Sequence, residues 1–301
     1  MRLLYCMMPS AWASTGAAAW RNRRRSAVVP ALSYLFCLAL SGPLFAAEGA
    51  QLRVCFLGNN LPFSSQHDER GFDVDVARAV AKTMGRTLVP VWVRNDERIT
   101  EVDESDFPLR RLSRNECDAI LSVPGRDAVR EASNVTVGNA YYGAAFELLG
   151  REGQTPASLH DIEHQVVAVQ AQTIASFILE SLKISMQTFF STEESLAAVA
   201  TGDAELAFVW GPTAGWYAKQ EPGTKLTFAT GEPISVARWN EHIATRTEDE
   251  ALRTALDAAL TTLRRSGELK AIAQRYGVPF YPPFEKTYDV MEMFRLSRAK
   301  E

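Results

Sequence analysis

The sequence predicts an α/β fold with two lobes. A strand, a polar loop and an amphipathic helix follow one another in residues 52–86, and the same alternation starts again near residue 166. The chain has 301 residues, 47% of them hydrophobic and 23% charged, which suits a globular protein with two medium-sized domains. The second α/β unit is therefore predicted to be a small domain inserted into the chain.

The first of these units, residues 52–86, contains the clearest pattern. Leu52, Val54 and Phe56 alternate with other residues, as in a strand that buries one face. Residues 58–60 (Gly-Asn-Asn) then end the strand, and apolar residues spaced by three and four predict a helix over 72–84 that stops at Gly85. This order places the polar loop at the carboxyl end of a sheet, where ligands of open α/β folds bind.

The remaining elements follow from the same periodicities. We expect strands at 87–93, 118–123, 166–169, 187–190 and 206–210, and helices at 108–115, 172–182, 193–200, 215–220, 249–263 and 267–276. Pro90 suggests that its strand lies at a sheet edge. Residues 94–107 are dense in charge and predict a solvated loop. Residues 147–151 and 226–236 are the candidate crossings between the lobes.

The first 47 residues have the features of a cleavable export signal. Arginines at 21–25 precede an almost wholly apolar stretch, 27–45, and the small residues Ala46 and Ala47 follow. A membrane anchor helix is the alternative, although two prolines within the stretch favour cleavage. Removal of residues 1–47 deletes five Arg and no acid, so the formal net charge falls from −4 to −9, which argues against a nucleic-acid partner. We expect a periplasmic protein.

Export also bears on the cysteines. Cys55 and Cys117 are the two that remain after removal of the signal, and each lies in or beside an apolar strand. An exported chain with two cysteines is expected to pair them, here between adjacent strands of lobe one. Two buried free thiols, or a metal site with two thiolates, are the alternatives.

Five stretches of the sequence resemble family 3 periplasmic solute-binding proteins. They read LRVCFLGNNLPFS with GFDVDVARAVAKTMGR, LHDIEHQVVAVQAQTIASFI, and SLAAVATGDAELAFVWGPTAGWYAKQ with ALDAALTTLRRSGELKAIAQRYGVP. The cysteine, NNLPFS, VWGPTAGWYAK and RYGVP are similar to a subgroup, the J proteins found with methanol dehydrogenase and other quinoprotein dehydrogenases. The resemblance implies a type II periplasmic binding fold, with two α/β lobes joined by two crossover strands. It places lobe one at 51–147 plus 237–279, lobe two at 148–236, and a C-terminal extension at 280–301.

The resemblance also implies a ligand site between the lobes. It assigns ligand contacts to Asn59, Asn60, Phe63, Ser122, Pro124, Arg130, Tyr141, Gln172, Thr173 and Trp210. Arg126 rivals Arg130 as an anion anchor, and either could instead be a solvated loop charge. Tyr141 has the alternative of a core or hinge aromatic, and Thr173 that of an ordinary helix cap.

Position 210 is the main departure from the family pattern. The family has an aspartate there that pairs with the amino group of an amino acid, and a tryptophan cannot accept that hydrogen bond. A buried ammonium without an acceptor would cost several kcal/mol. We therefore expect a small organic solute, such as an apolar or aromatic organic acid, or a partner's side chain, and not a free amino acid. Trp210 could also simply fill the core.

Three functions remain open. The first is a receptor that delivers a solute to an ABC permease. The second is an accessory protein that binds a periplasmic quinoprotein dehydrogenase or its cytochrome c. The third is a dehydratase-like enzyme on the same fold. The sequence has no GxSxG, HExxH, P-loop or GxGxxG motif, so we expect no catalytic residue, no metal and no cofactor.

Overall fold

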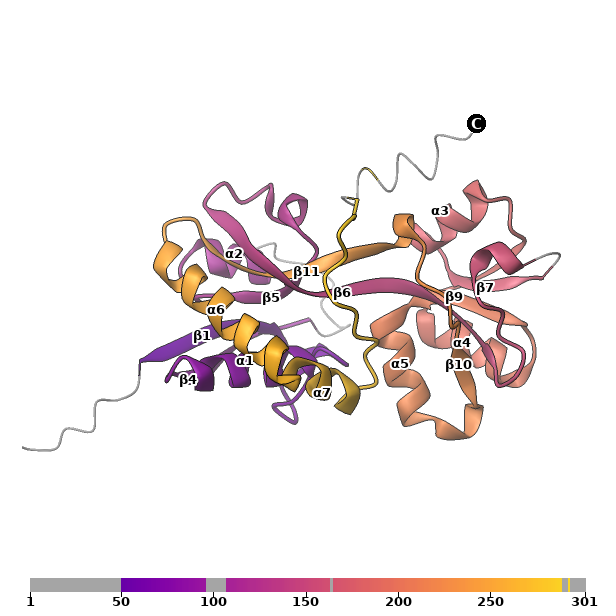
Figure 1. The fold of residues 1–301 in the computed structure, drawn as a ribbon, viewed down its shortest axis with the longest axis horizontal. Helices are drawn as coiled ribbons and strands as arrows, with labels where there is room; N and C mark the ends of the chain where they lie inside the picture. The colour runs from indigo at the N-terminus through magenta and orange to yellow at the C-terminus, as the bar shows by residue number, and fades with distance from the viewer. Residues whose placement is uncertain (1–49, 96–106, 163–164, 289–291, 293–301) are drawn as a thin grey trace, which may run out of the picture. The chain divides into compact units, whose positions relative to one another are not determined.

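The computed structural model describes residues 50–95, 107–162, 165–288 and 292 (Figure 1). The expected signal segment, residues 1–47, lies outside this part of the chain, as does most of the charged loop expected at 94–107. Among the described residues, no helix has the length and apolar character that a membrane crossing needs.

The described chain forms two α/β lobes (Figure 1). Lobe one contains the strands β1 (Gln51–Leu57), β4 (Thr87–Val93) and β5 (Ile120–Val123) and the helices α1 (Phe72–Thr83), α2 (Pro108–Ser113), α6 (Glu250–Ser266) and α7 (Glu268–Arg275). Lobe two contains the strands β7 (Val167–Gln170), β8 (Met186–Phe189), β9 (Leu206–Trp210) and β10 (Leu226–Phe228) and the helices α3 (Ile174–Ser181), α4 (Thr192–Thr201) and α5 (Gly211–Gln220).

Two long antiparallel strands, β6 (Val135–Arg151) and β11 (Arg238–Arg246), run from one lobe to the other (Figure 1). They belong to one sheet with the order β5-β11-β6-β9-β7-β8, and β10 also pairs with β6. The return crossing predicted at 226–236 is wrong. Its first residues form β10 inside lobe two, where Leu226 and Phe228 pack on a buried apolar cluster, and the chain returns along β11. We keep the extents given above for the two lobes as a proposed division.

The first strand and helix form as the pattern predicts. Strand β1 pairs in parallel with β4 over its whole length, and Leu52, Val54 and Phe56 are buried. Among the described strands β4 pairs only with β1, which gives Pro90 the edge position it requires. The apolar stripe of α1 packs in one core with α6 and α7. Each fully buried Val or Leu in this core contributes about 1.5–3 kcal/mol.

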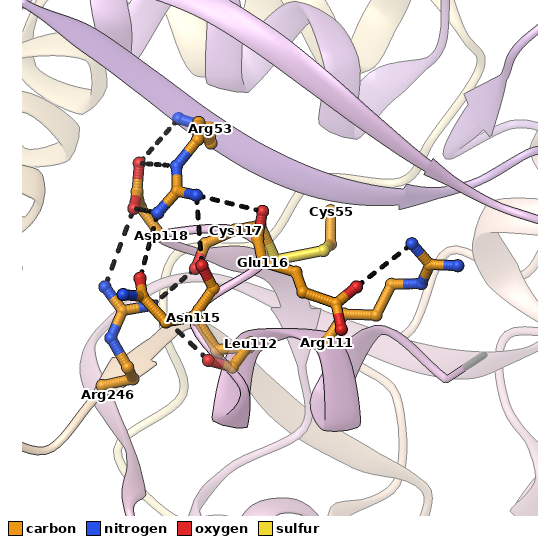
Figure 2. The surroundings of a disulfide bond; sticks show 9 residues. All are labelled: Arg53, Cys55, Arg111, Leu112, Asn115, Glu116, Cys117, Asp118 and Arg246. Atoms are coloured by element: carbon orange, nitrogen blue, oxygen red, sulfur yellow. Dashed lines mark hydrogen bonds and ion pairs between the residues drawn. A yellow bond between two sulfur atoms is a disulfide. The ribbon is translucent and has the colours of Figure 1, made fainter. Parts of the chain in front are cut away.

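The predicted disulfide joins Cys55 of β1 to Cys117, with the two Cα atoms 5.7 Å apart (Figure 2). Two residues beyond Cys117, Ala119 forms a parallel bridge to the neighbour of Cys55 in β1, so the cross-linked segments are adjacent. An ionic network surrounds the bond. The Nη2 of Arg53 lies 2.6 Å from Oδ1 of Asp118, and Arg246 donates to the carbonyl of Cys117 at 2.6 Å (Figure 2). The network ties β1, β11 and the segment before β5 together.

The segment after α7 packs across the crossover strands. Phe280 stacks on Tyr142 of β6 with ring centroids 5.8 Å apart, and Tyr281 bridges Gly143 of the same strand. Further along, the backbone N–H of Phe284 donates to the side chain of Asn240 in β11 at 2.8 Å. Residues 280–284, at the start of the C-terminal extension, are therefore bound to both β6 and β11.

Candidate ligand cavity

A cavity of about 620 Å³ lies where the carboxyl ends of β1 and β5 meet the crossover region. Lobe one supplies most of its wall, from the loop after β1, the start of α1 and the segments around α2 and β5. Lobe two adds Trp210 at the end of β9, and β11 adds Trp239 and Glu241. The size and the mainly apolar wall are typical of a small-molecule site.

Five of the ten predicted ligand residues line this cavity. They are Asn60, Phe63, Ser122, Pro124 and Trp210. Four come from lobe one, at the ends of the first strand and of β5. That is the edge where the sequence pattern places ligand contacts.

Asn59 and Tyr141 lie beside the cavity without lining it. The backbone N–H and carbonyl of Asn59 are both bonded to the side chain of Asn95, at 2.8 and 2.7 Å, and Asn59 is exposed. Tyr141 is buried in the core, where its hydroxyl lies 3.2 Å from the hydroxyl of Ser122. Tyr141 thus matches its alternative as a core aromatic that supports the cavity wall from behind.

The other three predicted residues, all possible anion contacts, also do not line the cavity. Arg130 is exposed at the end of a short 3-10 helix (Arg126–Val129), and its rival Arg126 lines a different hollow. Thr173 caps α3 in a capping box with Ser176, and Gln172 precedes that cap with a φ of 59°. Thr173 therefore matches its alternative as a helix cap.

The sequence interpretation missed Asp73, a buried carboxyl group in the cavity wall. Asp73 stands in the first turn of α1 and is 7% exposed. The hydroxyl of Ser122 donates to its Oδ1 at 2.6 Å. Burial raises the pKa of Asp73 to about 7, against the opposing effect of that hydrogen bond. An acid in the first turn of a helix is common, so the sequence pattern alone does not distinguish this residue.

Glu241 of β11 is the second carboxyl group that the sequence interpretation missed. It is 3% exposed, and the indole N–H of Trp239 donates to its Oε1 at 2.9 Å. Its Oε2 is buried and has no hydrogen-bond partner among the described residues. Burial, with a smaller contribution from the negative charge of Asp73, raises the pKa of Glu241 to about 8, although the hydrogen bond from Trp239 opposes this shift. The spacing of Trp239 and Glu241, two residues apart in a strand, is a signal that they share a face.

Trp210 both lines the cavity and packs against other aromatic rings. Its ring stacks on Trp239 with centroids 4.7 Å apart and an interplanar angle of 11°, and Phe146 meets its ring at 5.5 Å. The next residue is Gly211, where a side chain would come within 2.9 Å of the carbonyl oxygen of Ala145. This close approach of β9 to β6 fixes the tryptophan at the cavity wall, where it also packs in an aromatic cluster, and its contact with a ligand stays a prediction.

The cavity thus combines aromatic walls with two buried acids. Its basic residue among the described lining residues is Arg110, which is exposed. Arg130 and Thr173, the expected polar contacts, do not line the cavity, whereas Asp73 and Glu241 do. The described residues contain no group of three or more His, Cys, Asp or Glu placed to hold a metal ion.

The chain belongs to the bacterial extracellular solute-binding proteins, family 3, whose model matches residues 52–279. The likeness to solved structures agrees with the two-lobed type II periplasmic binding fold. The chain is 24% identical over 269 residues to the probable ABC transporter arginine-binding protein ArtJ of Chlamydia trachomatis, covering 85% of this chain and 98% of the relative.

Two further similarities are to J proteins, the subgroup that the sequence resembles. Protein MoxJ of Methylorubrum extorquens is 24% identical over 273 residues, which cover 79% of this chain and 85% of MoxJ. The crystal structure of MxaJ from Methlophaga aminisulfidivorans MPT matches with a TM-score of 0.55 and 21% identity, and covers 76% of this chain and 99% of that one.

Proposed function

We propose that this protein is a periplasmic receptor that binds a small organic solute between its lobes and presents it to an ABC permease. The cavity of about 620 Å³ carries this proposal, because its wall combines lobe-one loops with Trp210 of lobe two. Closure of two lobes around a ligand is the usual motion of such receptors. The disulfide between Cys55 and Cys117 and the cleavable signal expected at 1–47 fit an exported chain in an oxidising compartment.

One observation favours a second candidate, the accessory protein of a quinoprotein dehydrogenase. Tyr281 donates to Glu147 of β6 at 2.9 Å, and Phe284 is bonded to Asn240 of β11. A segment bonded to both crossover strands would resist the hinge bending that a transport receptor needs. Such a protein would bind the dehydrogenase or its cytochrome c. The similarity of this chain to MoxJ and MxaJ supports this candidate. The dehydratase-like enzyme stays the third alternative.

The test starts from protein purified from the periplasm of an expression host. Denaturation followed by mass spectrometry of the released small molecules identifies any bound solute. Thermal shift and calorimetry then measure binding of amino acids, amines, organic acids and neutral solutes. Phe63→Ala, in the cavity wall, should weaken binding at least tenfold. Phe190→Ala is the matched control, since Phe190 is 92% exposed and does not line the cavity.

Scattering measurements separate the two candidates. A transport receptor should become more compact when solute is added, whereas an accessory protein should bind the dehydrogenase or cytochrome c without solute and without compaction. The receptor proposal fails if no solute is released and none of the panel binds.

A further inference from the structure

We propose that the cavity binds an organic cation, with its ammonium group against the carboxyl groups of Glu241 and Asp73 and its apolar part against the indole rings of Trp210 and Trp239. The inference rests on the proposed solute-binding function and names the chemical class of the solute. It also replaces the organic acid that the sequence suggests.

The two acids come from different elements but line the same cavity. Asp73 belongs to α1 and Glu241 to β11. One oxygen of each is already held, Oδ1 of Asp73 by the hydroxyl of Ser122 and Oε1 of Glu241 by the indole of Trp239. The Oε2 of Glu241 remains buried without a partner in the described part of the chain. A buried polar atom of this kind costs about 1–3 kcal/mol, or more when charged, so a donor from the ligand would relieve that cost.

The groups around Glu241 do not neutralise it. Asp73, Tyr141 and Tyr142 face it from α1 and β6, and Trp239 bonds it from its own strand. None of these side chains carries a positive charge. Arg110 also lines the cavity, but it is exposed and does not supply a buried charge. A ligand ammonium would therefore favour the ionised form of these acids and act as their buried counterion, while a ligand carboxylate would meet them without a buried positive charge.

The aromatic wall suits the same class of ligand. Trp210, Trp239 and Phe63 all line the cavity. A cation near an indole ring gains about 0.5–2 kcal/mol from the ring quadrupole, with the larger value where water is excluded. Carboxyl groups beside aromatic rings thus favour a cationic head with an apolar body over an anionic one.

Binding of a cation should be linked to proton release. Because the pKa of Glu241 is raised to about 8 by burial, this group is mostly protonated at pH 7 in the free protein. The ammonium binds the ionised form, so the Oε2 proton passes to the buffer. Affinity should rise at least tenfold per pH unit between pH 6 and 7 and level off above pH 8, because Asp73, whose pKa is raised to about 7, ionises in the same range. A quaternary ammonium isolates this effect, because the ligand itself does not titrate.

The experiment is calorimetry with benzyltrimethylammonium, choline, benzylamine, benzyl alcohol and benzoate at pH 6, 7 and 8.5. We expect at least one cation to bind, more tightly at high pH, with release of about one to two protons at pH 7 when buffers of different ionisation enthalpy are compared. Benzoate and benzyl alcohol should bind at least tenfold more weakly. The wild-type pH dependence needs no variant, so it remains informative if a substituted protein fails to fold.

Variants assign the effect to the site. Glu241→Gln keeps the size of the side chain and should weaken cation binding at least tenfold at pH 8.5 and reduce proton release at pH 7 by about one proton. Asp73→Asn should weaken binding in the same direction. Glu147→Gln is the matched control, because Glu147 is also buried and has a pKa raised to about 7 but does not line the cavity. Its substitution should leave cation binding unchanged.

The possible failures can be told apart. Carboxylate solutes that bind more tightly than cations, or cation binding that Glu241→Gln leaves intact, would overturn the inference and leave the receptor proposal standing. If neither the panel nor any molecule released from the purified protein binds, both proposals fall together.

Discussion

The substitution Glu241→Gln should change how the stability of the free protein depends on pH. The buried carboxyl group has its pKa raised from 4.5 to about 8. The unfolded chain therefore loses this proton from about pH 4.5 upward, while the folded protein keeps it until about pH 8. Because the unfolded state then binds fewer protons than the folded state, the wild-type protein becomes less stable as the pH rises through this window.

The magnitude follows from the two pKa values. Between pH 5 and pH 8 this single group should remove about 3 kcal/mol from the free energy of unfolding. Glutamine cannot ionise, and its amide oxygen can still accept the hydrogen bond from Trp239. The variant should therefore lose about 3 kcal/mol less than the wild type between these two pH values.

Urea unfolding at pH 5, 6.5 and 8, followed by circular dichroism, measures the difference. Glu205→Gln, which removes an exposed carboxyl group of the same type, should leave the wild-type slope unchanged. Equal slopes for the wild type and Glu241→Gln would refute the reasoning. They would mean that Glu241 is ionised in the folded protein at pH 5, or that Oε2 is solvated.

Three further predictions concern the framework of the site. Replacement of both Cys55 and Cys117 by Ala should lower the free energy of unfolding by about 4 kcal/mol from loop entropy, and dithiothreitol should destabilise the wild type but not this variant. Tyr281→Phe should lower the free energy of unfolding by about 1–3 kcal/mol, because Glu147 loses its hydrogen-bond donor. It should also speed hydrogen exchange in β6. Unchanged exchange would contradict the idea that the segment after α7 stiffens the crossover strands. Thr173→Ala should cost about 1 kcal/mol through loss of the α3 cap and leave solute binding unchanged, whereas a tenfold loss of affinity would restore Thr173 as a ligand contact.

The local framework could be predicted from the sequence because its causes are local. Alternating apolar residues specify β1, a stripe with helical spacing specifies α1, and Pro90 indicates an edge strand. The disulfide followed from export and from the strand positions of Cys55 and Cys117. Each of these predictions needs only the chemistry of neighbouring residues and the rule that consecutive strand–helix units build one sheet.

The cavity could be predicted only in part, because its wall is assembled from distant segments. Asn60, Phe63 and Ser122 lie at strand ends, which is where a sheet of this type binds ligands. The burial of Glu241, in contrast, depends on pairing between β11 and β6, whose residues lie about a hundred positions apart in the chain. The sequence pattern shows a glutamate in a strand but not which segments cover it. The family resemblance assigns Thr173 a ligand role from its place in the sequence. That place does not determine whether the side chain lines the cavity, and Thr173 does not line it.

The substitution of the family's aspartate by Trp210 excludes an ammonium ligand only if no other acceptor lines the cavity. Glu241 and Asp73 are such acceptors, so the amino end of a solute can be accommodated. The remaining argument against a free amino acid as the ligand concerns its carboxylate group. This group would approach two buried acids, and the described lining residues include no buried basic residue to pair with it.

A matched pair of ligands tests this difference. Phenylalanine and phenethylamine differ only in the α-carboxylate and share the ammonium group and the aromatic ring. Calorimetry at pH 8 should detect phenethylamine and find phenylalanine at least tenfold weaker, in line with repulsion between its carboxylate and the two acids. Equal binding would mean that the cavity supplies an anion contact, and the assignment of Glu241 and Asp73 as the determinants of ligand charge would then be wrong.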